Sequence, residues 1–144
     1  MRSAFIVLFL VAGVQNAATA SSEALIGDWY TEGVEHGIHV QSIIHNLGDG
    51  TFTKDLHIVT ACDAANNSVE TGSWSFDGKT YAEITKSVDG MAQDSNAPDM
   101  NDTFDYANID NEHITLHDPK TNITWMFTRV SPDYHMPPAS GCTV

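Results

Sequence analysis

The stretch VETGSWSFDGKTYAEITKSV (residues 69–88) contains two runs of alternating residues that meet at an Asp-Gly pair. Trp74 and Phe76 lie two residues apart in the first run, and a β-strand presents such residues on one face. An Asp-Gly pair supplies the positive φ angles that a tight hairpin turn requires. The stretch therefore predicts an antiparallel β-hairpin with one apolar face.

Similar runs, separated by turn residues, occupy most of the chain. We predict about eight strands, over residues 24–30, 40–47, 51–60, 69–76, 79–88, 103–109, 113–117 and 122–130. The one helical turn that we expect lies around residues 32–39. Consecutive hairpins of this kind predict an all-β fold with a single antiparallel up-and-down sheet. Closure into a barrel is favoured because it removes the exposed edges of the sheet.

The N-terminus has the features of a secretory signal peptide. Arg2 precedes the apolar run AFIVLFLVAGV (residues 4–14), and ATA (residues 18–20) resembles a cleavage site with small residues. The run is shorter than the roughly 20 apolar residues that a membrane anchor needs. We expect cleavage after Ala20, a secreted or periplasmic location, a barrel domain over residues 21–130 and a C-terminal tail over residues 131–144.

The expected mature chain is strongly acidic. Without Arg2, five Lys and Arg residues remain against nineteen Asp and Glu residues, a formal net charge of −14. This charge repels phosphate backbones and anionic lipids, so we expect no nucleic-acid partner and no membrane insertion. Acidity of this kind also keeps a secreted protein soluble. Basic partners and cationic ligands remain compatible with it.

The two cysteines, Cys62 and Cys142, are expected to pair in an oxidising compartment. Such a structural disulfide would tie the C-terminal tail to the loop after the third strand. On the chain-entropy estimate it would stabilise the fold by about 4 kcal/mol. The sequons at Asn66, Asn101 and Asn122 would be glycosylated only in a eukaryotic secretory pathway.

The two ends of the predicted barrel sequence contain residues that can meet. Gly27-Asp28-Trp29 lies near the mature start, and Arg129 ends the last predicted strand. The first and last strands of a closed barrel are neighbours. We therefore expect the guanidinium of Arg129 to stack on the ring of Trp29, a cation–π contact worth roughly 0.5–2 kcal/mol. Gly27 is expected to let backbone approach closely beside that ring.

These residues resemble the Gly-x-Trp and Arg signature of the lipocalin and calycin superfamily. The resemblance covers most of residues 24–130 as strand order and turn placement, with GDGTFT (residues 48–53), GSWSFDGKTYAEI (residues 72–84) and ITLHDPKTNITWMFTRV (residues 114–130) as further matches. It implies that Gly27, Trp29 and Arg129 close one end of the barrel and make no ligand contacts. The chain is shorter than the larger lipocalins, so its barrel can be filled by its own side chains.

Aromatic side chains are the strongest indication of a binding site. In the predicted strands they alternate with polar residues and share one face of the sheet. The predicted ligand-binding residues are Phe52, Trp74, Phe76, Tyr81, Phe104, Tyr106, Trp125 and Phe127. The hypothesis is a secreted protein that holds a small apolar or amphipathic ligand inside the barrel, with the acidic loop over residues 89–102 as its cover. The alternative is a packed core without a cavity.

The histidines do not predict a metal or cofactor site. His36 and His39 with Glu35 are a loose match to a zinc site, but scattered surface histidines are the favoured interpretation. His113 and His117 lie about 13 Å apart on a strand and are expected to face water.

No motif for an activated nucleophile is present, so we expect no enzymatic activity. Glu83, which shares a face with Tyr81, is the acid to consider if the interior were catalytic, although a rim or solvent position is favoured. A second hypothesis is a protease inhibitor or other protein-binding module, in which the segment SSEAL (residues 21–25) is a free N-terminal arm.

Overall fold

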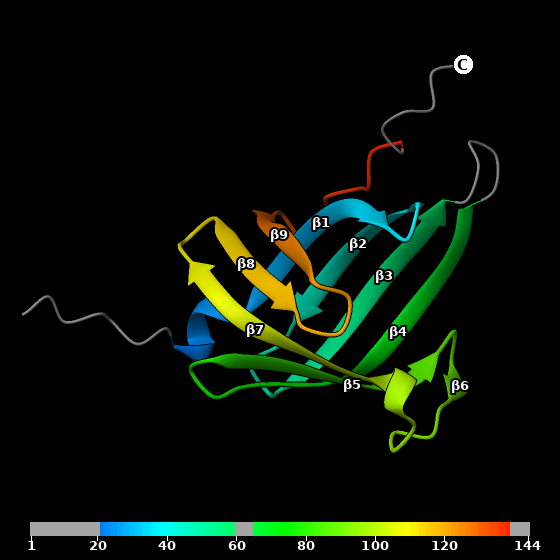
Figure 1. Ribbon diagram of the computed structural model, residues 1–144, viewed down its shortest axis with the longest axis horizontal. Helices are drawn as coiled ribbons and strands as arrows, with labels where there is room; N and C mark the ends of the chain where they lie inside the picture. Colours follow the sequence, from blue (N-terminus) through cyan, green and yellow to red (C-terminus); the bar gives the residue numbers. More distant parts are fainter. Residues whose placement is uncertain (1–20, 60–64, 139–144) are drawn as a thin grey trace, which may run out of the picture.

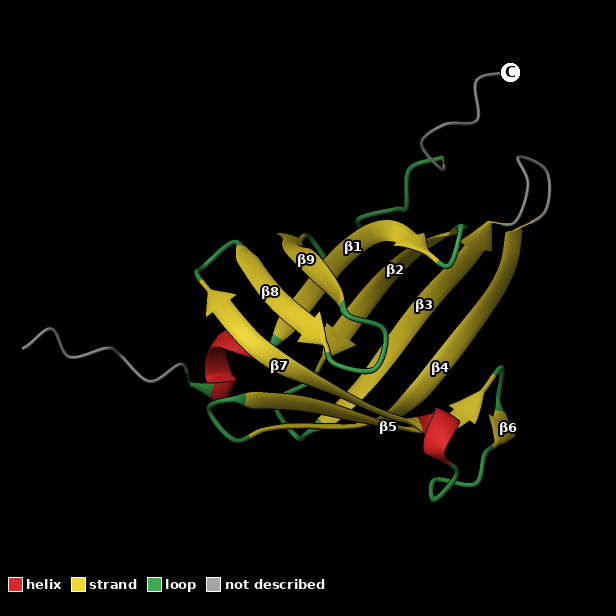
Figure 2. Cartoon of the chain, viewed as in Figure 1, coloured by secondary structure: helices red, strands yellow, loops and turns green. Residues whose placement is uncertain are grey.

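Hairpins and short turns connect nearly all of the strands, in a computed structural model that describes residues 21–59 and 65–138. Two 3₁₀ helices flank or interrupt the strands: η1 (Ser22–Leu25) and η2 (Pro98–Met100). The strands are β1 (Gly27–Glu35), β2 (Ile38–Asn46), β3 (Thr51–Val59), β4 (Ala65–Phe76), β5 (Thr80–Val88), β6 (Met91–Ala92), β7 (Asn101–Ile109), β8 (His113–Asp118) and β9 (Ile123–Val130). Figure 2 shows that strands dominate this part of the chain.

The sheet closes on itself as an eight-stranded barrel. Strands that follow one another in sequence pair, except that β5 pairs with β7 past the short β6, and the pairing β1–β9 closes the ring. All pairings are antiparallel, and the two-residue β6 pairs with β5 outside the ring (Figure 1). The predicted all-β, up-and-down barrel is confirmed. Within the described ranges, no helix is both long and apolar enough to cross a membrane.

The predicted contact between the first and last strands is confirmed. Trp29 pairs with Arg129 across β1 and β9, and the guanidinium carbon lies 4.1 Å from the centre of the indole ring. Arg129 also donates hydrogen bonds to the backbone oxygens of Ala24, Ile26 and Asn111 at 2.8–3.0 Å. The guanidinium thus joins η1, the β7–β8 turn and β9 at one end of the barrel, which we call the closed end.

Gly27 has a different neighbour from the one that the sequence suggested. A Cβ atom at this position would lie 2.5 Å from Nη1 of Arg129, and the φ angle of +126° is one that other residues rarely adopt. The close neighbour is therefore the arginine side chain and not backbone, so that part of the prediction was wrong. The reason is that the guanidinium must pass Gly27 to reach the carbonyl of Ala24.

The helical turn that we expected around residues 32–39 is absent, and this prediction was also wrong. β1 continues to Glu35 and β2 begins at Ile38. His36 and Gly37, with φ angles of 49° and 81°, reverse the chain between them. A left-handed backbone at both turn positions produces a tight hairpin and stops any helix.

The C-terminal tail begins on the outside of the barrel. Tyr134 lies with its ring centre 5.3 Å from that of Tyr30, and the buried Gln41 donates a hydrogen bond to the carbonyl of Pro137 at 3.0 Å. The predicted signal peptide, Cys62 and Cys142 lie outside the described residues. The signal peptide and the disulfide therefore remain predictions.

Candidate functional site

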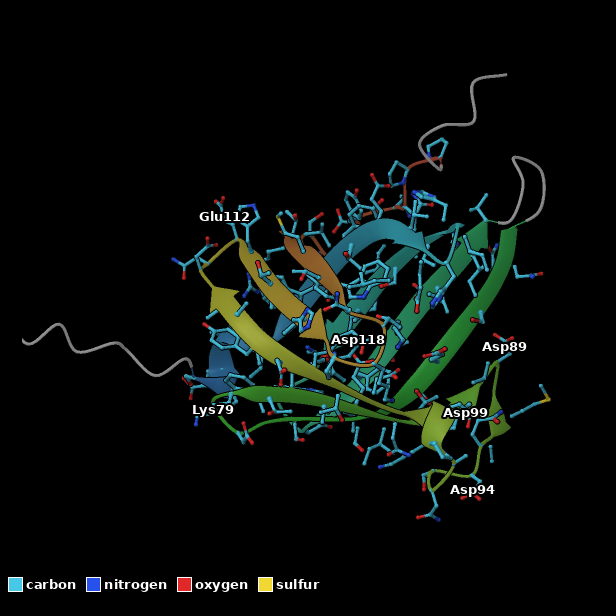
Figure 3. The ribbon with its side chains drawn as sticks, in the orientation of Figure 1. Lys79, Asp89, Asp94, Asp99, Glu112 and Asp118 are labelled. Atoms are coloured by element: carbon cyan, nitrogen blue, oxygen red, sulfur yellow. The ribbon has the colours of Figure 1, made fainter. Side chains whose placement is uncertain are left out.

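The half of the barrel opposite the closed end, which we call the open half, contains a cavity of about 270 Å³. Figure 3 shows Lys79 and Glu112 near the closed end, whereas Asp99 and Asp118 lie toward the cavity. Every barrel strand contributes to the lining, together with η2. The described residues that line it are Thr31, Glu35, Val40, Ser42, Ile44, Lys54, Leu56, Ile58, Glu70, Glu83, Thr85, Asp99, Met100, Asp102, Phe104, Asp118, Trp125 and Phe127.

Three of the eight predicted ligand-binding residues line this cavity. They are Phe104 on β7 with Trp125 and Phe127 on β9, and they form an aromatic wall. Gly33 on β1 leaves room for the indole, because a Cβ atom there would lie 2.7 Å from the ring of Trp125. The wall supplies the broad apolar surface that small-molecule sites use.

The other five predicted residues lie at or near the closed end. Phe52, Trp74 and Tyr81 are buried with Trp29 in the apolar core. Phe76 and Tyr106 meet edge to face, with ring centres 5.4 Å apart. A void between these core residues measures about 10 Å³, roughly the minimum for a single water. One half of the barrel is thus a packed core and the other half is hollow.

A buried ion triad forms the floor of the cavity. Lys54 on β3 lies 2.9 Å from Glu70 on β4 and 2.9 Å from Glu83 on β5. Burial alone would lower the pKa of Lys54, but the charges of Glu83 and Glu70 outweigh burial and raise that pKa. The lysine therefore stays charged, and it is occupied on both sides by carboxylates.

Glu83 does not lie at the rim or in solvent, as the sequence had suggested. Its side chain is only 2% exposed, and its Oε1 lies 2.9 Å from the hydroxyl of Tyr81. That hydroxyl is also 3.1 Å from Oδ1 of Asn46. Burial, with the charge of Glu83, raises the pKa of Tyr81, so the phenol remains a donor. Glu83 therefore links the packed core to the cavity floor.

Asp102 on β7 lies beside Glu83, its partner across the β5–β7 ladder. Burial raises the pKa of Asp102, against the opposing charge of Lys54. Its nearest cation is Lys120 at 3.6 Å, and both side chains are about half exposed. Such a partly exposed ion pair contributes little energy, so the carboxylate remains available to other cations.

Two hydroxyl groups line the same cavity. Ser42 on β2 and Thr85 on β5 are each 5% exposed, and both line the cavity. Neither hydroxyl has a hydrogen-bond partner among the side chains and backbone that the structure describes. Both hydroxyls therefore add polar groups to the cavity lining.

The acidic loop over residues 89–102 lies beside the cavity, where the hypothesis placed a cover. It contains β6 and η2, and its Asp99, Met100 and Asp102 belong to the lining. Asn101 holds the loop together by donating hydrogen bonds to the carbonyls of Ser95 and Ala97. The end of the loop that is nearest β7 thus forms part of the cavity mouth.

The histidines lie away from this cavity. His113 and His117 flank the buried Ile114 and Leu116 and face outward, as expected. The closest approach of Glu35 to His36 is 3.8 Å. No group of three or more His, Cys, Asp or Glu side chains in residues 21–59 and 65–138 is arranged to hold a metal.

The N-terminal segment is folded onto the barrel. Residues Ser22–Leu25 form η1, Leu25 is buried in the core, and its carbonyl accepts hydrogen bonds from Trp29 and Asn46. A free arm at these residues was the feature that suggested a protease inhibitor. The structure gives no such arm in this segment.

Sequence reasoning missed Lys54, Glu70, Asp102, Ser42 and Thr85. For Lys54 the signal was available, since it lies midway between Phe52 and Leu56, two apolar residues that a strand presents on one face. Alternation therefore also directs Lys54 inward. For the others, the sequence did not reveal which strands lie across the barrel from one another.

No protein-family model matches this sequence, and a search of curated proteins finds no similar one. The closed antiparallel barrel is compatible with a calycin-like fold.

Proposed function

We propose that this protein is a secreted, lipocalin-like carrier that binds a small amphipathic molecule in the open half of its barrel. The observation that carries the proposal is the cavity of about 270 Å³, with an aromatic wall on one side and polar groups on the other. Sites for drug-sized molecules usually measure roughly 300–1,000 Å³. The cavity therefore suits a ligand at or below the lower end of that range.

The closed end supports the lipocalin comparison. Trp29 and Arg129 close the barrel, and neither residue lines the cavity, as the family resemblance implies. The residues that close the barrel and the residues expected to bind the ligand therefore lie in different halves of the barrel. Substitutions in the cavity should weaken binding while the closed end preserves the fold.

Titration with N-phenyl-1-naphthylamine, a neutral apolar fluorophore, tests the proposal. Probe fluorescence should rise on binding to the parent protein, and Trp125→Ala should weaken that binding by roughly tenfold through the loss of ring contacts. Met126→Ala is the matched control, because Met126 is the next residue on β9 and is 62% exposed. Equal probe affinity in the two variants, or no binding by the parent protein, would count against the proposal.

Export is part of the same proposal. N-terminal sequencing of protein secreted by an expressing cell should begin at Ser21. Intact mass before and after reduction should reveal a disulfide between Cys62 and Cys142 as a gain of two hydrogens. A mature chain that retains residues 1–20 would show that the leader is not removed.

A further inference from the structure

The cavity carries an excess of negative charge. Of the described residues that line it, six have carboxylates and one has an ammonium group. The triad of Lys54, Glu70 and Glu83 alone keeps a net charge of −1, most of it buried. Asp102 lies next to Glu83 and adds to this charge. An uncompensated negative charge inside a partly buried cavity favours the binding of a cation there.

Lys54 is not available to an anionic ligand. Its ammonium lies 2.9 Å from a carboxylate oxygen of each glutamate, so two of its three donors are already used. A carboxylate or phosphate that approached Lys54 would have to pass the acidic mouth and displace one of the two glutamates. The geometry therefore disfavours fatty acids and other anions as ligands.

A second observation, independent of the acidic residues, also points to a guest molecule. Ser42 and Thr85, which are each 5% exposed as residues, line the same cavity, and no hydrogen bond joins either hydroxyl to another group in the described part of the chain. Both can accept a hydrogen bond from a ligand N–H. Thr85 lies two residues from Glu83 on β5, so acceptor and carboxylate share one face of the strand.

We infer that the ligand is a small organic cation, with an ammonium group held at Asp102 and Thr85 and an apolar part against Trp125 and Phe104. This inference rests on the proposed function, since it names the chemical class that the same cavity selects. The ammonium group acts as the counter-ion of the acidic wall. The aromatic wall binds the hydrocarbon part and attracts the positive charge through its ring faces.

Three probes with one skeleton test the inference: 4-phenylbutylamine, 4-phenylbutanol and 4-phenylbutyrate. Isothermal titration calorimetry at pH 7 should give the amine an affinity at least roughly tenfold above that of the alcohol, with the carboxylate weakest. Asp102→Asn should bring the affinity of the amine close to that of the alcohol. Asp105→Asn is the matched control, because Asp105 is exposed on the other face of β7 and does not line the cavity.

The outcomes separate this inference from the proposed function. If the alcohol binds as tightly as the amine, or if Asp102→Asn and Asp105→Asn behave alike, the charge selection is overturned while the cavity remains a binding site. If none of the three probes binds and N-phenyl-1-naphthylamine also fails, both proposals fall. Circular dichroism of each variant identifies any loss of affinity that comes from unfolding.

Discussion

Replacement of Arg129 by methionine should strongly destabilise the barrel while leaving its chain topology unchanged. The substitution removes three hydrogen bonds to backbone carbonyls at 2.8–3.0 Å and the stacking on Trp29 at 4.1 Å. A net value of roughly 0.5–1 kcal/mol for each hydrogen bond and about 1 kcal/mol for the stacking gives a loss of about 3 kcal/mol. This would be a large share of the stability of a single domain.

Urea unfolding, followed by far-UV circular dichroism, measures this loss. With a slope of about 1.5 kcal/mol per molar urea, the midpoint should fall by about 2 M. Arg129→Lys should lose less, because the lysine keeps the charge over the ring but lacks the planar fork that reaches several carbonyls. Thr128→Ala, at the exposed neighbouring position, should shift the free energy of unfolding by no more than about 0.5 kcal/mol.

A double substitution tests the steric part of the reasoning. Gly27→Ala should destabilise the parent, since its Cβ would lie 2.5 Å from Nη1 of Arg129, and should destabilise Arg129→Met by less. The strain from the φ angle of +126° remains in both backgrounds. If Arg129→Met unfolds at the same urea concentration as Thr128→Ala, the guanidinium does not hold the closed end and the reasoning is refuted.

Three further predictions concern the rest of the barrel. Lys54→Met should lower the free energy of unfolding, measured by urea unfolding, by about 3–5 kcal/mol, because it leaves Glu83 buried without its cation. Combining Lys54→Met with Glu83→Gln should recover part of that loss. Gly33→Ala should weaken probe binding and shift the fluorescence of Trp125, whose ring lies 2.7 Å from the new Cβ position; an unchanged spectrum would show that the ring is free to move. Backbone N–H groups in a hairpin turn hold the pKa of Asp77 below its usual range. The stabilisation from this carboxylate is therefore complete well above the unfolded pKa of about 3.9 and disappears as pH falls through the lower folded value, so Asp77→Asn should flatten the loss of stability in acid unfolding curves.

The sequence was sufficient for the fold because the decisive signals are local. Alternation around Asp-Gly pairs defined the hairpins, and the position of Arg129 at the end of the last strand predicted its contact with Trp29. The error around residues 32–39 arose because His36 adopts a positive φ angle, which is uncommon outside glycine and has no clear sequence signature.

The candidate site was less predictable because it depends on which strands face one another across the barrel. Glu83 was placed at the rim or in solvent, since a carboxylate in a barrel interior is unfavourable until its cation is known. That cation is Lys54, 29 residues earlier in the chain and on a strand that is not its neighbour. The charged groups of the site therefore depend on how strands that are not neighbours are placed across the barrel. A single sequence does not reveal that placement.

Stability alone does not account for the polar floor of the cavity. Well-packed apolar residues usually stabilise a fold as well as a buried ion group does, because desolvation of the charges offsets their attraction. The closed end follows that rule, with Trp29, Tyr81 and Leu116 around a void of only about 10 Å³. The open half departs from it, with a charged triad below an empty space of about 270 Å³. Both arrangements occur in one barrel. Apolar side chains fill the closed end, whereas charged side chains and a cavity occupy the open half. The proposed binding of a small organic cation would account for this departure in the open half.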